Sequence, residues 1–383
     1  MKKKTTITVL IIVILGFIFF LFGKKLDPRG VPQNLNQEEK KDWLAEKLYE
    51  SMYTRKPIDI GYEEPSQEDI QSKKQKTDLT KKYPSKINAL FELGTNTATL
   101  FYFSDELKDL GVNTYFVQAE TRIENGELKI FQPCYSKKCI LSQEEAERVV
   151  IDRMLMAKQE GFSVGFVPDL PDAFEVGREN YNIDELNPRF KEMILKWAEI
   201  AEEYGVEYFV PINEYETLLY TNGYTIEKVY QYTNNFYDDL IPKIRKIYNG
   251  KIIIKSGALD SWSNQKGISR KKADLFGLGN WHAGTADEIK ESTQKMVEVA
   301  DEISVRDNLP WLVTEYYVAT QEDVEESFGQ EGIVLPMKEA YEAGLSELKK
   351  SEENIGFTFT GYIGRGKIRG TEAVSVLKNY FNK

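Results

Sequence analysis

Two glutamates end segments that are otherwise apolar, Glu214 in VPINEYE and Glu315 in WLVTEYY. A buried carboxylate without a partner is costly, so such a glutamate is either paired with another group or kept for chemistry. Hydrolysis of a glycosidic bond is one reaction that needs two carboxyl groups. One protonates the leaving oxygen and the other attacks the anomeric carbon, and in retaining enzymes the two lie about 5 to 5.5 Å apart. The fold must therefore bring together two residues that are distant in sequence.

The elements that position these glutamates follow a repeated pattern from Ile87 to the end of the chain. Short segments rich in β-branched and aromatic residues alternate with longer amphipathic ones, which is typical of βα units around a parallel sheet. The sequence predicts eight strands, at residues 87–93, 113–120, 163–169, 207–214, 251–256, 275–281, 311–317 and 355–362. The last helical segment, GTEAVSVLKNYF, completes the ring. We therefore predict an α/β fold, a (β/α)8 TIM barrel, over residues 87–383.

The carboxyl ends of the strands form the active site in barrels of this kind. Strands four and seven face each other across the barrel mouth, so Glu214 and Glu315 can meet there. Further candidates for contacting a ligand also lie at strand ends: Gln118, Glu120, Asp169, Asp172, Asn213, Asp260, Trp281, His282, Tyr316 and Tyr362.

With Asn213–Glu214 at the end of strand four and Glu315 at the end of strand seven, the chain resembles the clan A glycoside hydrolases. That group of (β/α)8 barrels contains cellulases, β-mannanases and β-galactanases. The resemblance implies that Glu214 is the general acid/base, that Asn213 binds the sugar 2-hydroxyl and that Glu315 is the nucleophile. Trp281 and His282 lie where the clan often places a residue that contacts the nucleophile or the sugar. Asp169, Tyr316 and Tyr362 are further candidates for binding the substrate.

Two features of the clan's pattern differ in this chain. The clan has an arginine near the end of strand two that contacts the nucleophile, and here the nearest arginine is Arg122. The clan's strand-eight tryptophan is absent, and Tyr362 is the aromatic residue that can take its place. The resemblance implies retaining hydrolysis of a β-linked oligo- or polysaccharide without a cofactor or metal. A catalytically inactive, membrane-displayed barrel that binds glycans is an alternative.

Composition argues against two classes of partner. His282 is the one histidine among 383 residues, so a metal held by several imidazoles cannot be built from this chain. The net charge is −11, whereas a nucleic-acid partner requires clustered lysine and arginine to neutralise phosphates. The sequence contains 22 tyrosines, 20 phenylalanines and 5 tryptophans, which suit a barrel core and stacking on sugar rings.

The N-terminal part predicts a membrane anchor. Residues 5–22 form an uncharged apolar run of about the length that a helix needs to cross a bilayer. Lysines flank the run, and no small-residue cleavage site or lipid-accepting cysteine is present. We therefore expect residues 1–25 to be an uncleaved transmembrane helix. Three lysines before the run against two after it place the barrel outside the cytoplasm.

Residues 26–86 are predicted to be a polar linker with a short amphipathic helix. The helix runs from Asn36 to Tyr53, and Asn36 with Glu39 matches a capping box. The two cysteines, Cys134 and Cys139, are spaced for one local disulfide, which would agree with an oxidising compartment.

Three other chemistries stay open. Asp169, Glu214 and Asp260 could hold Mg²⁺ at the ends of three successive strands, as in an enolase-like barrel. The glycine-rich segment GYIGRGKIRG after strand eight could bind a phosphate, although a solvated basic turn is the simpler interpretation. Lys255 could form a Schiff base with a carbonyl substrate, although an exposed lysine is again simpler.

Overall fold

The computed structural model describes residues 35–54, 60–92, 96–124, 127–130, 141–169, 182–257, 259, 261–282, 284–319, 335–364 and 366–382. The chain divides into two compact units, one of Met1–Glu63 with Cys134–Cys139 and one of Glu64–Pro133 with Ile140–Lys383. The predicted membrane anchor and the predicted Cys134–Cys139 disulfide lie outside the described residues. Within the described part of the chain, no helix has the length and apolar character needed to span a bilayer.

The described part of the first unit contains helix α2 (Gln37–Thr54). The backbone N–H of Asn36 donates to Glu39 Oε2 at 2.8 Å, and the N–H of Glu39 donates to Asn36 Oδ1 at 2.9 Å. This reciprocal pair is a capping box, which satisfies amide groups that would otherwise lack partners at the helix start. The predicted helix and its cap are therefore confirmed.

The second unit contains a closed barrel of eight parallel strands, as predicted. In barrel order these are β1 (Ile87–Phe91), β2 (Thr114–Glu124), β4 (Ser163–Asp169), β5 (Tyr208–Phe209), β6 (Lys251–Ser256), β7 (Leu275–His282), β8 (Trp311–Val318) and β9 (Asn354–Thr360). Each strand pairs in parallel with the next, and β1 pairs with both β2 and β9, which closes the ring. Strand β3 (Glu127–Ile130) was not predicted, and it pairs antiparallel with the end of β2.

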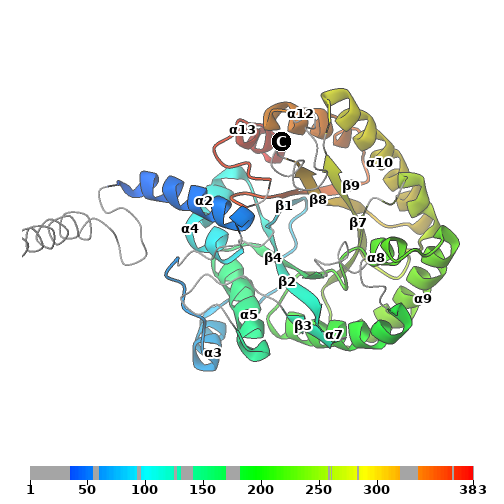
Figure 1. The fold of residues 1–383 in the computed structure, drawn as a ribbon, viewed down its shortest axis with the longest axis horizontal. Helices are drawn as coiled ribbons and strands as arrows, with labels where there is room; N and C mark the ends of the chain where they lie inside the picture. The colour runs from blue at the N-terminus through cyan, green and yellow to red at the C-terminus, as the bar shows by residue number, and fades with distance from the viewer. Residues whose placement is uncertain are drawn as a thin grey trace, which may run out of the picture. The chain divides into compact units, whose positions relative to one another are not determined.

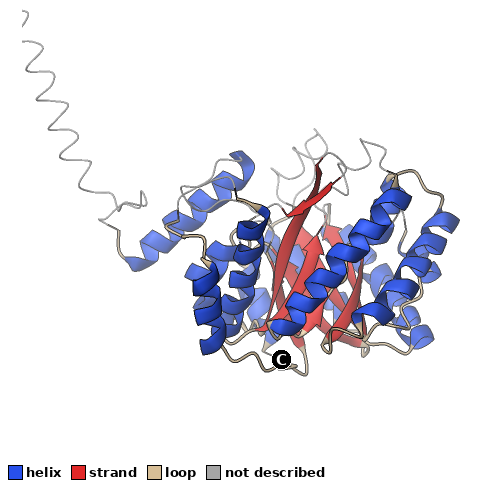
Figure 2. Ribbon diagram, turned by 90° about the horizontal axis from the view of Figure 1, so that it is seen from below, coloured by secondary structure: helices blue, strands red, loops and turns tan. Residues whose placement is uncertain are grey.

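Helices surround the strands of this unit, as Figure 1 shows along the barrel and Figure 2 from the side. They are α3 (Gln67–Lys76), α4 (Asn96–Leu110), α5 (Gln143–Gln159), α7 (Ile183–Glu203), α8 (Tyr215–Thr221), α9 (Ile226–Ile244), the 3₁₀ helix η1 (Trp262–Gly267), α10 (Ala286–Asp307), α12 (Met337–Leu348) and α13 (Ala373–Phe381). Capping boxes at Ser142 with Glu145 and at Thr285 with Glu288 begin α5 and α10.

Alternate residues of the strands fill the barrel interior. Its core is a cluster of buried apolar side chains: Ile87, Ala89, Phe91, Phe116, Val167, Tyr208, Val210, Ile253, Leu275 and Leu312. Successive strand residues point to opposite faces, so the residues two positions beyond these face inward as well. On β4 and β6 those inward residues are Asp169 and Lys255. Their polar groups therefore lie next to the apolar cluster, toward the carboxyl ends of the strands.

The segment before β1, part of the predicted linker, packs on the barrel. The hydroxyl of Ser163 donates to Lys82 O at 2.6 Å, and the carboxylate of Glu207 accepts from Lys82 N at 2.8 Å. Glu207 also pairs with Lys158 at 2.5 Å, and both side chains are buried. This ion pair lies at the amino-terminal ends of the strands, where barrel residues mainly stabilise the fold.

Candidate active site

Glu214 and Glu315 meet at the carboxyl ends of the strands through one lysine. The ammonium of Lys255 donates to Glu214 Oε1 at 3.0 Å and to Glu315 Oε2 at 2.8 Å. These two carboxylate oxygens are therefore no more than 5.8 Å apart, the sum of the two distances. The side chain of Lys255 is 1% exposed and that of each glutamate is 21% exposed. A buried cation therefore binds two carboxylates that remain accessible from the barrel mouth.

A strand irregularity directs Glu315 into the barrel. The pairing of β8 with β9 shifts register between Val313 and Tyr316. A Cβ built at Gly277 would lie 2.0 Å from Thr314 Cγ2, and one at Gly279 would lie 3.4 Å from Glu315 Cβ. Side chains of adjacent residues normally point to opposite faces of a strand, and the register shift lets these two share one face.

Glu214 lies at the start of α8 in a left-handed backbone conformation, with φ 48° and ψ 50°. Such a conformation is uncommon for any residue except glycine and costs on the order of 1–3 kcal/mol. Residues held in this way cluster at functional sites, because the surrounding structure must compensate for the strain. The bend turns the Glu214 carboxylate toward Lys255.

Asn213 is held in one orientation by groups of opposite character. Its amide nitrogen donates to Asp169 Oδ1 at 2.7 Å, and its amide oxygen accepts from Lys255. The second oxygen of Asp169 accepts from Gln118 of β2. Because a carboxylate only accepts and an ammonium only donates, the Asn213 amide cannot flip. Asn213 uses one of its two amide hydrogens for Asp169, so the second can be directed at a ligand.

The charges of the cluster shift its titration. Burial raises the pKa of Glu214, and Lys255 opposes the increase. Burial likewise raises the pKa of Asp169, against the opposing effects of Lys255 and the hydrogen bond from Asn213. For Lys255, burial lowers the pKa, but Glu214, Glu315 and Asp169 together raise it well above its usual range. The site therefore combines a permanent ammonium with carboxyl groups that retain protons more readily than free ones.

The structure contradicts both interpretations of Lys255 made from the sequence, an exposed lysine and a Schiff-base lysine. It is buried, so the expectation of an exposed lysine was wrong. A Schiff base requires a neutral amine as nucleophile, whereas three carboxyl groups keep this one charged. The signal available in the sequence was the alternation of KIIIKS, in which Lys255 shares the inward face with Ile253.

Two glycines make room for the Glu214 carboxylate. A Cβ at Gly257 would lie 2.3 Å from Glu214 Oε2, and one at Gly279 would lie 3.1 Å from Oε1. The N–H of Gly257 donates to Glu216 Oε1 at 2.8 Å, which fixes the backbone after β6. Burial, followed by the negative charge of Glu214, raises the pKa of Glu216 to about 7.

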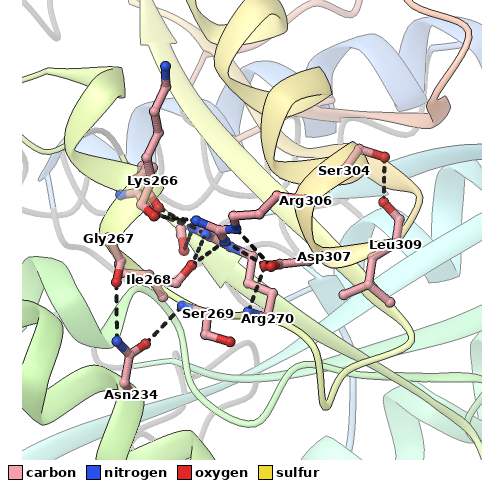
Figure 3. A network of polar contacts seen from close by, with 12 residues as sticks. Asn234, Lys266, Gly267, Ile268, Ser269, Arg270, Ser304, Arg306, Asp307 and Leu309 are labelled. Atoms are coloured by element: carbon pink, nitrogen blue, oxygen red, sulfur yellow. Dashed lines mark hydrogen bonds and ion pairs between the residues drawn. The ribbon is translucent and has the colours of Figure 1, made fainter.

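A buried polar network supports the segment that follows Gly257. Arg270 donates to Ser256 Oγ at 3.0 Å and to Gln265 Oε1 at 2.6 Å. Figure 3 shows the part of this network in which Asp307 accepts from the Arg270 backbone at 3.0 Å and also from Arg306. These bonds join η1 to the end of α10 and so anchor Ser256 at the end of β6, the residue next to Lys255.

Two predicted substrate contacts lie on the other face of the sheet. The hydroxyl of Tyr316 donates to Ala340 O in α12 at 3.1 Å, and the ring is fully buried. The His282 ring packs on Tyr316 at 4.6 Å and lies 3.5 Å from the Thr293 hydroxyl in α10. The prediction that His282 and Tyr316 contact a sugar was therefore wrong, since strand alternation turns both toward the helices.

Tyr362 also differs from its prediction. Its hydroxyl donates to Glu106 Oε2 in α4 at 2.8 Å, its ring packs edge-on against Phe103, and the side chain is 3% exposed. Tyr362 therefore does not replace the missing tryptophan as a sugar platform.

The amides of the glycine-rich segment bind an internal anion. The N–H groups of Tyr362, Ile363 and Gly364 donate to the buried carboxylate of Glu92 at 2.7, 3.3 and 2.8 Å. Arg369 pairs with Glu106 at 2.7 Å. These three amides and Arg369, which a phosphate site here would use, are therefore engaged with carboxylates of this chain.

Trp281 is an accessible aromatic side chain at a strand end. It is 43% exposed, lies at the end of β7, and contacts Tyr317 edge-on at 5.8 Å between centroids. Tyr317 lies two residues beyond Glu315, so the pair is close to the carboxylates along both strands. Arg122, in contrast, lies opposite Lys129 in the antiparallel pairing of β2 with β3. This part of β2 extends beyond its pairing with β4 in the barrel sheet, which ends at Glu120.

The magnesium alternative receives no support from the described residues. Asp172 and Asp260 lie outside them. Within the described ranges, no group of three or more histidine, cysteine, aspartate or glutamate side chains could hold a metal ion. Lys255 already supplies the positive charge between Asp169 and Glu214.

The similarity of this chain to known proteins lies in its fold. No protein-family model and no curated protein sequence matches this chain. Among solved structures, a GH113 β-1,4-mannanase superposes with a TM-score of 0.57 at 13% identity, covering 78% of this chain and 98% of that one. A GH113 β-mannanase from Alicyclobacillus acidocaldarius gives 0.56 at 14% identity, covering 79% and 98%. The endo-β-1,4-mannanase from Thermotoga petrophila gives 0.55 at 12% identity, covering 79% and 77%.

These likenesses, all below 15% identity, concern the fold. They show that this chain shares its (β/α)8 barrel fold, which the sequence predicted, with these β-mannanases.

Proposed function

We propose that this protein is a retaining glycoside hydrolase that acts on a β-linked glycan. The observation that carries the proposal is the pair of carboxylates, Glu214 and Glu315, with oxygens no more than 5.8 Å apart at the barrel mouth. That limit agrees with the separation of about 5 to 5.5 Å that a double displacement requires. The fold shared with β-mannanases supports the reaction class.

In this mechanism Glu315 attacks the anomeric carbon while Glu214 gives its proton to the leaving oxygen. The bond from the anomeric carbon to the leaving oxygen breaks, and a glycosyl ester on Glu315 forms. Glu214 then removes a proton from water, which attacks the ester and restores both residues. The raised pKa of Glu214 suits the residue that must begin as an acid. Asn213 supplies its second amide hydrogen to the sugar 2-hydroxyl.

The test compares leaving groups in Glu214→Gln and Glu315→Gln. On β-linked polysaccharides both variants should lose turnover. On aryl β-glycosides whose leaving groups need no proton, Glu214→Gln should still form the glycosyl ester, whereas Glu315→Gln should not. Glu202→Gln is the matched control, because Glu202 accepts from Asn249 at the opposite end of the barrel. Full activity of Glu315→Gln on any substrate would refute the proposal.

A barrel that binds a glycan without turnover is the second candidate. The observation that favours it is Lys255, whose charge and hydrogen bond favour the ionised form of Glu214. An acid/base residue must instead hold a proton in the first step. Glycan binding by the wild type, with no product on any substrate and unchanged affinity in Glu315→Gln, would establish this function.

For the cellular setting, we propose that residues 1–25 anchor the barrel to a membrane with its mouth outside the cytoplasm. The apolar run and its flanking lysines support this arrangement. Protease added to intact cells should digest the barrel. Protection of the barrel until the cells are lysed would reverse the orientation.

A further inference from the structure

We propose that Lys255 is the positioning residue of this site and supplies, from the fifth barrel strand, the positive charge that holds both carboxylates. The inference rests on the proposed function in that it assigns a role within the same reaction. The second strand contributes Gln118, a neutral side chain that donates to Asp169. The cation of the site comes instead from β6.

The hydrogen bonds of Lys255 account for all of its donors. An ammonium has three N–H donors and no acceptor. Lys255 donates to Asn213, to Glu214 at 3.0 Å and to Glu315 at 2.8 Å. These acceptors come from the β5–α8 junction and from β8, so one side chain sets the relative positions of both carboxylates and the amide. With its donors used, Lys255 positions the residues that contact substrate and does not itself bind the sugar.

The surroundings of Lys255 explain why the charge is tolerated in the barrel. The carboxyl groups of Asp169, from β4, and of Glu214 and Glu315 face it. The ring of Phe91, from β1, lies 5.6 Å from the ammonium, within the range of a cation–π contact. On the β7 side, Gly279 leaves space for both glutamates. A buried cation paired this fully is costly to remove, because its partners then become uncompensated.

The test compares Lys255→Met with Lys255→Arg. Methionine keeps the length of the side chain and removes the charge, so kcat should fall at least about tenfold. The acidic limb of the pH–activity profile should move to higher pH, because a nearby positive charge favours ionised carboxylates. Arginine keeps the charge, but its planar fork cannot serve three converging acceptors, so it should restore the pH profile and only part of kcat.

Lys158→Met is the matched control. Lys158 is also buried and also pairs with a carboxylate, Glu207, at the other end of the barrel. Its removal should lower thermal stability and leave the pH profile of the active protein unchanged. The role assigned to Lys255 is refuted if Lys255→Met keeps the wild-type profile and kcat, or if Lys158→Met shifts the profile equally.

A measurement without activity separates this inference from the proposed function. The melting temperatures of Lys255→Met, Glu315→Gln and the double variant form a cycle. If the ammonium holds the carboxylate, the double variant should lose less than the two single losses combined. Lys255→Arg with Glu315→Gln provides the same cycle should the methionine variant not fold. If the losses of melting temperature are additive, the inference is overturned, even if the protein proves to be a binding barrel. If the losses are coupled but the protein is inactive, the proposed function alone is overturned.

Discussion

Gly257→Ala should separate the position of the Glu214 carboxylate from the stability of the barrel. The alanine Cβ would lie 2.3 Å from Glu214 Oε2 and 2.6 Å from its Cδ. Non-bonded heavy atoms in good contact lie about 3.5 Å apart, so the carboxylate must retreat by about 1 Å. A misplacement of about 1 Å at a reacting group can cost about 100-fold in rate. Glu214 is a flexible side chain with 21% of its surface exposed, so the retreat itself should cost little stability.

The assay measures kcat/KM on two substrates and the melting temperature of each variant. On a β-linked oligosaccharide, whose leaving oxygen must be protonated, Gly257→Ala should lose about 100-fold. On an aryl glycoside with an acidic leaving group the loss should be much smaller. The melting temperature should stay near that of the wild type.

Gly165→Ala is the control with the opposite pattern. Its Cβ would lie 2.2 Å from Phe116 Cδ1, a buried ring of the barrel core. Overpacking of a closed core costs about 1–3 kcal/mol, so this variant should melt several degrees lower and keep the wild-type ratio of the two rates. Equal rates of Gly257→Ala and wild type on the oligosaccharide would refute the argument that Glu214 acts from this position.

Two further predictions concern pH. The pKa of Glu216 is raised to about 7, so between about pH 4.5 and 7 the folded state keeps a proton that the unfolded state loses, and stability falls as pH rises. Glu216→Gln should remove up to about 3 kcal/mol of this dependence, measured by urea unfolding at pH 5 and 8, and parallel curves for both proteins would contradict it. Burial lowers the pKa of His282 to about 3, so the NMR signals of this one histidine should not titrate between pH 5 and 8. A transition near pH 6.5 would mean that the ring is exposed to water.

The barrel could be predicted because its signals are local and repeated. Each strand is a short apolar run and each helix an amphipathic one, so the eight units are visible without any knowledge of long-range contacts. The strand β3 was missed because ELKI is only four residues long and pairs with an extension of β2. The brevity of β5, two residues in place of eight predicted, follows from the turn that carries Asn213 into the site.

Positions at strand ends could be predicted, but the face of each side chain could not. A shift of one residue in strand register moves a side chain from the barrel interior to the helix layer. The register cannot be read from the sequence of a single strand. Glu315 faces inward because β8 is irregular just before it, and the same irregularity turns Tyr316 toward α12. His282 is the last residue of β7 and Tyr362 lies two residues beyond β9, and their side chains contact helices α10 and α4.

The lysine at the centre of the site also limits what single substitutions can reveal. Glu214, Glu315 and Asn213 share one ammonium, so the removal of any acceptor leaves Lys255 to redistribute its donors among the others. Substitutions within such a unit are not additive, and the size of a loss does not identify the role of the residue removed. The dependence on the leaving group does identify it, because protonation of the leaving oxygen is needed for one class of substrate and not for the other. The roles of Glu214 and Glu315 should therefore be assigned from the ratio of rates on the two substrates, with Lys255 intact.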